Sequence, residues 1–303
     1  MTSYPDFDEL PFLGKLDVRH ARDVLAPDKG TVAFIGPDQV RAATATVSAG
    51  VSYGLSEPFE TFSQPLFDRP VLRHEIVETG RNEVEDVFSD YNPQSYSQLD
   101  GLPHVRAREY GFFGGGDIAT AQETSGVHHW ARAGIVGRGV LLDIHGDRLA
   151  RTGTDDPSLG EPITPDELDY VAHRQGTELH EGDILLLRTG WLEHYRSRPP
   201  SEKVSAWNGM HGGEETARYL WNRRIALVGA DNPAVECAPG SREAGSLHRR
   251  LLPSLGMSLL ELLRLDELSE ACRTHGRWEF LLTIAPLPVH GAVSSPASTI
   301  AVL

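Results

Sequence analysis

Apolar residues along this chain fall into patterns typical of a mixed α/β protein. The segment DILLLRTGW, residues 183–191, contains a continuous apolar run, which predicts a strand buried on both faces. Similar runs predict strands in GRGVLLDI (137–144), RRIALVGAD (223–231) and WEFLLTIAPLPV (278–289). Segments with helical spacing lie between them. The pattern therefore predicts an α/β fold in which several buried strands form the core.

The clearest helix signal lies in ITPDELDYVAHRQG, residues 163–176. Thr164 can cap the helix, Pro165 suits its first turn, and Glu167 completes a capping box. Gly176 can end the helix.

Three further segments have helical spacing. PDQVRAATATVSAG (37–50) and EETARYLWNRR (214–224) each predict one helix. Residues 247–272 predict two helical pieces, because Pro253 and Gly256 interrupt the pattern.

The domain organisation predicted from the sequence is simple. Residues 1–30, rich in Pro and Asp, are interpreted as an N-terminal arm that packs on the body or on a second subunit. Residues 31–303 are expected to form a single domain, with the Pro-, Gly- and Ser-containing stretches 151–163 and 196–213 as loops.

Composition and charge exclude several classes of partner. The 303 residues are 40% hydrophobic and 23% charged, as in an ordinary globular protein, and the formal net charge is -15. This charge argues against nucleic acid and anionic membranes, which both need a basic face. The segment MTSYPDFDELPF carries no basic region followed by an apolar run, so we do not expect secretion by a signal peptide. No apolar run is long enough to cross a bilayer. With only two cysteines, we expect a cytoplasmic protein without a disulfide framework.

The segment YNPQSYSQLDGLPHV, residues 91–105, carries the most informative polar pattern. Gln94, Tyr96, Gln98 and Asp100 alternate, so a strand would present them on one face. His104 follows beyond a turn, where Asp100 could orient its imidazole and raise its basicity. An edge strand with a solvated polar side is the alternative interpretation.

Six blocks of the chain resemble the cyclase family of metal-dependent hydrolases, which includes kynurenine formamidase and isatin hydrolase. They are QSYSQLDGLPH, HHWARAGIVGRGVLLDI, LHEGDILLLRTGW, ALVGADNPAVE, LHRRLLPSLGMSLLEL and WEFLLTIAPLPVHGAVSSPAS. The resemblance implies a single-domain α/β fold of the swivelling β/β/α type with a mixed sheet core. It also implies a homodimer or homotetramer whose active sites lie near subunit contacts.

The family's metal motif is His-x-x-x-His-x-Asp-x-x-x-His. Its positions correspond here to Gln94, Gln98, Asp100 and His104, so this chain resembles a subgroup in which glutamine replaces both metal-binding histidines. In the family the last histidine is the general base, which implies this role for His104. A second pair of family positions, on a predicted helix, matches His248 and Glu261.

The two glutamines leave the metal question open. Gln94, Gln98, Asp100, His248 and Glu261 would form an oxygen-rich set, which suits Mn²⁺, Mg²⁺ or Ca²⁺ better than Zn²⁺, the usual partner of imidazole. One divalent cation, Mn²⁺ or Zn²⁺, is therefore a candidate cofactor. A metal-free site is the alternative, with the glutamine amides as hydrogen-bond donors to a substrate.

Three functions fit these residues. The first is hydrolysis of a small amide, lactam or lactone, with His104 as the base and Asp100 and Glu261 as further catalytic residues. The second is a metal-independent cyclisation, dehydration or isomerisation of a carbonyl-rich metabolite. The third is a catalytically silent relative that binds a metabolite. In each case we expect a small-molecule ligand.

Four other side chains are candidates for substrate binding, each with a structural alternative. Tyr96 belongs to the polar row, and Trp130 and Trp191 could pack on a flat substrate or in the core. Arg138 could hold a carboxylate, although a structural salt bridge is the favoured interpretation.

Overall fold

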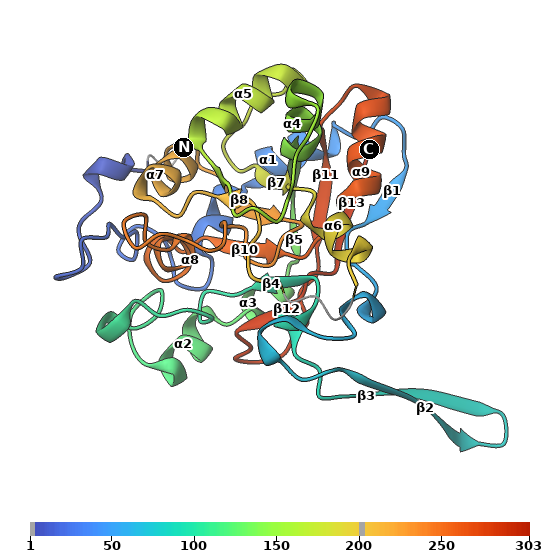
Figure 1. Ribbon diagram of the computed structural model, residues 1–303. Coiled ribbons are helices and arrows are strands. Elements are labelled where there is room, and N and C mark those ends of the chain that lie inside the picture. Colours follow the sequence, from blue (N-terminus) through green and yellow to red (C-terminus); the bar gives the residue numbers. More distant parts are fainter. Residues whose placement is uncertain (1–3, 200–203) are drawn as a thin grey trace.

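The computed structural model describes residues 4–199 and 204–303, and its centre is a sheet of nine strands (Figure 1). Strands β5, β7, β9 and β10 run parallel, and the strands on either side pair antiparallel with their neighbours. In spatial order the strands are β1 (Ser52–Gly54), β13 (Thr299–Val302), β11 (Glu279–Ile284), β5 (Ile135–Asp143), β7 (Ile184–Arg188), β9 (Leu227–Ala230), β10 (Ser258–Glu261), β4 (Gln98–Asp100) and β12 (Ser294–Pro296).

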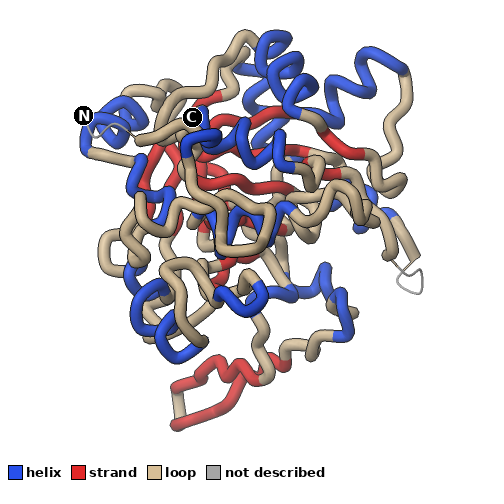
Figure 2. The backbone as a smooth tube through the Cα atoms, turned by 90° about the vertical axis from the view of Figure 1, so that its left-hand side faces the viewer, coloured by secondary structure: helices blue, strands red, loops and turns tan. Residues whose placement is uncertain are grey.

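Helices cover the sheet on more than one side. In Figure 1, α4 and α5 lie above the central strands, and α2 lies below β10; Figure 2 shows helices around the sheet from a second direction. The helices are α1 (Pro37–Thr44), α2 (Ile118–Ser125), α3 (His128–Ala131), α4 (Ile144–Thr152), α5 (Pro165–Gln175), α6 (Trp191–Ser197), α7 (Glu214–Asn222), α8 (Leu247–Arg250) and α9 (Asp266–His275). A separate short pair joins β6 (Pro162–Ile163) to β8 (Gly209–Met210).

The strands predicted from apolar runs are confirmed as β5, β7, β9 and β11. The run in β7 is central in the sheet, and its residues from Ile184 to Leu187 are fully buried, as expected for a strand covered on both faces. The helices predicted in 37–50 and 214–224 are confirmed as α1 and α7, although α1 already ends at Thr44.

The capped helix is confirmed as α5, with one difference at its start. The Thr164 hydroxyl accepts a hydrogen bond from the Glu167 backbone N–H at 3.3 Å, and Gly176 ends the helix in the left-handed conformation. The predicted second half of the capping box is wrong. The Glu167 carboxylate instead receives two hydrogen bonds of 2.8 Å from Arg148, because a bidentate ion pair is stronger than a bond to a backbone N–H.

The two helices predicted within residues 247–272 are the main error. Helix α8 continues into a π-helical turn, Leu251–Leu255, and the chain then forms β10 before α9 starts at Asp266. The run SLLELL is compatible with either helix or strand, and parallel pairing with β9 decides for the strand. Glu261 therefore lies at the end of a strand, whereas the prediction placed it on a helix.

The polar row of residues 94–100 is also only partly a strand. Pro93–Ser95 form a 3₁₀ turn, and the strand β4 is limited to Gln98–Asp100. Proline lacks the N–H that a strand ladder needs, which explains the late start. The row therefore does not form a single strand face.

A two-stranded hairpin, β2 (Arg73–Gly80) and β3 (Glu83–Ser89), extends away from the body at the lower right of Figure 1. Ile76, Val84 and Phe88 on this hairpin are 68%, 65% and 54% exposed. The cross-strand register places these three side chains on the same face. The same face also carries His74, Glu78 and Asp86, and nothing in the described chain covers it.

The N-terminal segment lies against the body of the molecule. Phe7, Leu10, Ala21 and Leu25 are buried within the main hydrophobic core. Among the described residues, no helix is both long and apolar enough to cross a membrane.

The parallel strands end at a common edge of the sheet, and a charged residue lies at each end. Asp143 ends β5, Arg188 ends β7, Asp231 follows β9 and Glu261 ends β10. Crevices beyond the carboxyl ends of parallel strands are common ligand sites. This edge of the sheet is therefore a candidate location for the functional site.

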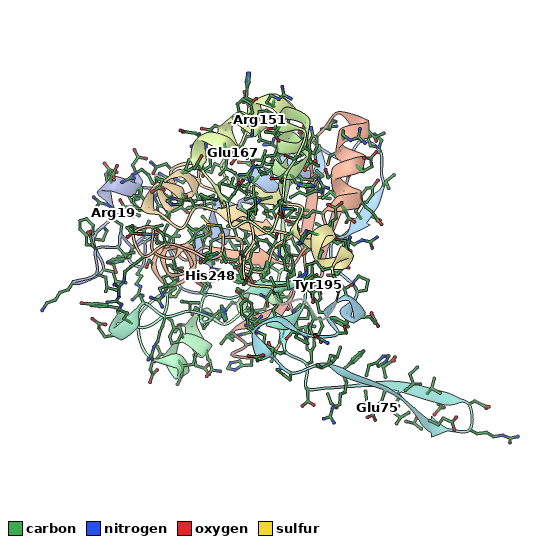
Figure 3. The ribbon with its side chains drawn as sticks, in the orientation of Figure 1. Arg19, Glu75, Arg151, Glu167, Tyr195 and His248 are labelled. Atoms are coloured by element: carbon green, nitrogen blue, oxygen red, sulfur yellow. The ribbon has the colours of Figure 1, made fainter. Side chains whose placement is uncertain are left out.

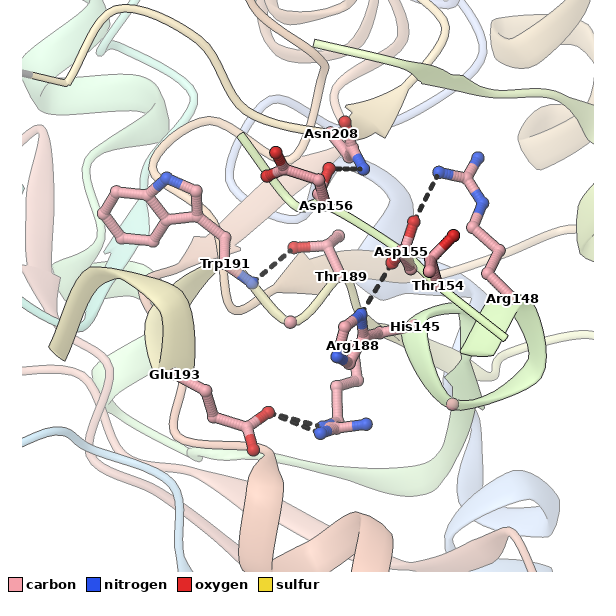
Figure 4. Close-up of polar contacts among 12 residues, drawn as sticks. His145, Arg148, Thr154, Asp155, Asp156, Arg188, Thr189, Trp191, Glu193 and Asn208 are labelled. Atoms are coloured by element: carbon pink, nitrogen blue, oxygen red, sulfur yellow. Dashed lines mark hydrogen bonds and ion pairs between the residues drawn. The ribbon is translucent and has the colours of Figure 1, made fainter. Parts of the chain in front are cut away.

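Structural partners already occupy most of this edge. Arg188 donates to Asp143 at 2.7 Å. Arg188 also pairs with Glu193, a contact drawn in Figure 4. Asp231 accepts hydrogen bonds from the Thr189 N–H at 2.7 Å and the Gly190 N–H at 2.8 Å, and burial raises its pKa to about 6. Glu261 differs from these residues, because its own partners, Gln98 and His248, are candidate functional residues.

We expect Asp231→Ala to destabilise the fold strongly. It would leave the buried N–H groups of Thr189 and Gly190 without an acceptor, at a cost of about 2–4 kcal/mol in the free energy of unfolding. Urea-induced unfolding measures this difference. The matched control is Asp38→Ala, which removes an exposed ion pair with Arg41 and should change stability little. Equal effects of the two substitutions would contradict the role assigned to Asp231.

Candidate functional site

Pairing between β4 and β10 creates the candidate site. In the antiparallel register Gln98 lies opposite Glu261, and Asp100 lies opposite Leu259. Side chains directly opposite each other share one face, so Gln98 and Glu261 meet, and the Gln98 amide donates a hydrogen bond to the Glu261 carboxylate. Two segments more than 150 residues apart in the chain are joined in this way.

Asp100 is the least satisfied group of the site. Its side chain is 1% exposed, and neither carboxylate oxygen has a hydrogen-bond partner among the described residues. Burial raises the pKa of Asp100 well above its ordinary value, and the nearby charge of Glu261 raises it further, while His248, Arg69 and the amide of the nearby Gln94 act in the opposite direction. A buried carboxylate without a donor needs either a proton or a cation.

His248 lies between two carboxylates. Its Nδ1 is 2.7 Å from Oε1 of Glu236, and its Nε2 is 3.0 Å from Oε1 of Glu261. Burial alone would lower the pKa of His248, but the hydrogen bonds to Glu236 and Glu261 outweigh it and raise the pKa well above its ordinary value. In the absence of a bound cation a protonated His248 therefore supplies positive charge between the two carboxylates.

His104 lies on the accessible side of the cluster. The turn after β4 closes with a hydrogen bond from the His104 N–H to the Gly101 carbonyl, and Nε2 of His104 lies 3.5 Å from Oδ2 of Asp100. Its Nδ1 is 3.3 Å from Nε2 of Gln94. Burial lowers the pKa of His104, so its imidazole is neutral at neutral pH.

All six residues predicted for the metal and the base thus lie together. Contacts join Gln94 to His104 and His104 to Asp100 on one side, and Gln98 to Glu261 and Glu261 to His248 on the other. The two groups meet where ligand atoms of Asp100, His248 and Glu261 lie within 4.8 Å of one another. Their individual roles stay predictions. Figure 3 shows His248 near the centre of the molecule, at the sheet.

The donor set fits a divalent cation. One ligand atom from each of Asp100, His248 and Glu261 lies within 4.8 Å of the other two. Oε1 of Gln98 is buried and also lacks a hydrogen-bond partner in the described structure, so it offers a further oxygen. Glu236 can hold a proton on Nδ1 of His248 and leave Nε2 for a metal, a common arrangement around metal-binding histidines.

Two residues of the site were missed in the sequence. Glu236 holds His248, and Arg69 donates a hydrogen bond to the Gln94 carbonyl. Burial lowers the pKa of Arg69, and the charges of Glu261 and Asp100 oppose this shift, which shows that its guanidinium lies near them. Glu236 ends the quoted block ALVGADNPAVE, so its acidic end was a usable signal. Arg69 lies outside every block.

The backbone next to two site carboxylates is strained. Val235, which precedes Glu236, has a φ of 56°, and Leu262, which follows Glu261, has a φ of 54°. Such left-handed conformations are costly for branched side chains and persist only where the surrounding structure imposes them. Here they lie directly beside the two carboxylates that hold His248.

The structure places the four predicted substrate-binding residues in different surroundings. Tyr96 and Trp191 belong to a buried aromatic cluster next to Leu262, and the Tyr96 hydroxyl accepts a hydrogen bond from the Leu72 N–H at 3.1 Å. Trp130 packs in the main core, and Arg138 forms an ion pair of 3.1 Å with Asp183. A role of these residues in substrate binding stays a prediction.

Comparison with known proteins identifies the family. The sequence model of the Cyclase family, described as "Putative cyclase", matches residues 53–237, which is more than half of the chain. The chain belongs to the Cyclase family. None of the curated protein sequences compared matches this cyclase-family chain.

Solved structures support the same fold for this cyclase-family protein. A crystal structure of "a novel cyclase" is 28% identical, covers 91% of this chain and 96% of its own, and has a TM-score of 0.80. Isatin hydrolase A from Labrenzia aggregata, bound to benzyl benzoate, is 18% identical over 87% of this chain and 97% of its own, with a TM-score of 0.59. A "potential metal-dependent hydrolase with cyclase activity" is 19% identical, and the match covers 83% of this chain and 98% of that protein, with a TM-score of 0.51. The expected cyclase-type α/β fold with a mixed sheet is confirmed.

We expect the double variant Gln94→His/Gln98→His to gain stoichiometric zinc. Two imidazole nitrogens would replace neutral carboxamides beside Asp100, and zinc prefers nitrogen ligands to amide oxygens. Elemental analysis after dialysis measures the bound metal. Gln64→His is the control and should gain none, because Gln64 is exposed and lies outside the candidate site. A double variant that folds but retains no zinc would show that these positions do not face a metal.

Proposed function

We propose that this cyclase-family protein hydrolyses a small amide, lactam or lactone, with His104 as the general base. The observation that carries the proposal is the buried Asp100, whose two oxygens lack hydrogen-bond partners beside a neutral, partly accessible imidazole. The hydrolase names of two structural neighbours support the same class of reaction.

The base needs a ring nitrogen with a free lone pair. When His104 carries its proton on Nδ1, Nε2 presents a lone pair toward Asp100, where a water molecule would be deprotonated. A half-turn of the Gln94 carboxamide exchanges its oxygen and its nitrogen, so Gln94 can accept from or donate to Nδ1. We infer that Gln94 holds the ring in either tautomer during the proton transfer.

Asp100, Glu261, His248 and Gln98 are the residues that would hold a divalent cation. We infer Mn²⁺ rather than Zn²⁺, because three of the four donors are oxygen atoms. Such an ion, when bound, lowers the pKa of a water molecule and polarises a carbonyl group. Glu236 keeps the proton of His248 on Nδ1, and Arg69 adds positive charge on the accessible side.

One observation favours a second candidate function. Without a cation the raised pKa of Asp100 favours its protonated form, which would place a carboxylic acid 3.5 Å from an imidazole of lowered pKa. An acid and a base at this distance suit cyclisation, dehydration or isomerisation of a carbonyl compound. The mass of the product separates the two functions, because only hydrolysis adds one molecule of water.

We expect His104→Ala to lower kcat/KM on aryl formamides, lactams or lactones by about 100-fold or more, as the loss of a general base does. Asp100→Asn should lower it by a similar factor, because a neutral amide binds a cation more weakly than a carboxylate and cannot relay a proton. His173→Ala, on the exposed side of α5, is the control and should behave like the wild type. Wild-type turnover by both site variants on every active substrate would exclude this site from the reaction.

We also propose that the chain forms a homodimer through the β2–β3 hairpin. An isolated two-stranded hairpin is only marginally stable in water, and Ile76, Val84 and Phe88 remain exposed on one face. Every copy of the chain carries this face, so a second copy is always available to cover it.

We expect Ile76→Asp/Val84→Asp to shift the protein from dimer to monomer, because two buried carboxylates would oppose association. Light scattering coupled to gel filtration measures the mass. Ile118→Asp, an exposed apolar position on α2, is the control and should leave the dimer intact. A wild-type chain that is monomeric at micromolar concentration would contradict the proposal.

A further inference from the structure

A second feature of the molecule stands apart from the proposed reaction. A cavity of about 660 Å³ lies between the N-terminal loop 15–18, residues 107–108, the loop 241–246 and the end of α8. Five basic side chains and one acidic side chain line it, in a protein that carries 43 acidic and 28 basic residues. The basic residues are Lys15, Arg108, Arg242, Arg249 and Arg250.

Most of these cations lack a negative partner. Elsewhere in the chain, arginines such as Arg138, Arg148 and Arg188 lie in ion pairs with carboxylates. In the part of the chain that the structure describes, the side chains of Lys15, Arg108, Arg242 and Arg249 form no ion pair or hydrogen bond. Arg250 is only 3.9 Å from Glu214. Like charges gathered around one cavity repel one another, and a bound anion would relieve this repulsion.

The cavity also has a defined frame. Arg108 has a φ of 49°, a left-handed conformation that is uncommon for arginine and often marks a functional loop. The buried part of Arg22 fixes this loop, because its guanidinium donates to the carbonyls of Tyr110 at 2.6 Å and Pro253 at 2.8 Å. The backbone N–H of Lys15 donates to the Tyr110 hydroxyl at 2.9 Å. Three walls of the cavity are therefore tied together.

The cavity shares elements with the candidate site. Arg249 follows His248 on α8, and Arg108 lies four residues after His104. Ser246, which lines the cavity, donates to Oε1 of Glu236, the residue that holds His248. Figure 3 labels Arg19 and His248, the sequence neighbours of the lining residues Val18 and Arg249.

We propose that this cavity binds a small molecule with two or more anionic groups, carboxylates or phosphates. Its volume is in the usual range for small-molecule sites. Arginine forks match carboxylate and phosphate oxygens in pairs, and several of them around one cavity recognise several such oxygens. The assignment does not depend on the proposed hydrolysis.

The test is calorimetric titration of the full-length protein with pyrophosphate and with citrate at low ionic strength. We expect saturable binding to the wild type, weakening with added salt because the contacts are ionic. Arg108→Ala/Arg249→Ala should weaken it at least tenfold. Lys15→Ala/Arg242→Ala, which alters other walls, should do the same if the first variant fails to fold.

Two controls make the result specific. Arg81→Ala/Arg132→Ala removes the same charge at exposed positions outside the cavity and should bind like the wild type. His104→Ala should also bind normally, which separates this site from the reaction. The proposal is overturned if neither anion binds, or if the control loses as much affinity as the cavity variants. It is also overturned if Arg108→Ala/Arg249→Ala weakens dimerisation and leaves anion affinity unchanged, since the basic wall would then hold a second copy of the chain.

Discussion

The local structure depends on one constraint: the carboxylates of Asp100 and Glu261 are buried close together, and burial disfavours two negative charges. Positive charge must therefore be near. His248, held by Glu236, supplies it from one side, and Arg69 supplies it from another. A divalent cation would supply it directly. The choice between a cation and a proton on Asp100 is thus the same as the choice between the two candidate functions.

The sheet maintains this constraint at some expense of backbone strain. The β4–β10 register places Gln98 opposite Glu261. Leu262, the residue after Glu261, is held by a hydrogen bond from the Ser97 hydroxyl to its carbonyl. Asn232 lies at the turn that leads to Glu236, and its carbonyl accepts from the Leu262 N–H. The left-handed residues beside Glu236 and Glu261 are therefore coupled through Asn232, so the two carboxylates around His248 are positioned as one unit.

Local signals in the sequence were sufficient for α5 and β7, because a cap, a terminal glycine and an unbroken apolar run each act within a few residues. The strand β10 was not predictable in this way, since the apolar pattern of SLLELL fits a helix and a strand equally well. Only its pairing with β9 makes it a strand. The family resemblance identified Gln94, Gln98, Asp100 and His104. It included Glu236 in a block without indicating its role, and it carried no information on Arg69; both roles arise from contacts between distant segments. Tyr96 was assigned to the polar row, but its ring packs in the buried aromatic cluster, a tertiary contact that the alternation of polar residues does not reveal.

The division of the site between two distant segments has a consequence for classification. The part that matches the Cyclase family ends at residue 237 and includes Asp100 and His104, whereas His248 and Glu261 lie beyond it. Relatives grouped by the first segment alone can differ in half of their ligands. Sorting such sequences by chemistry therefore requires that both segments be read together, with the strand that carries Glu261 aligned against the strand that carries Gln98.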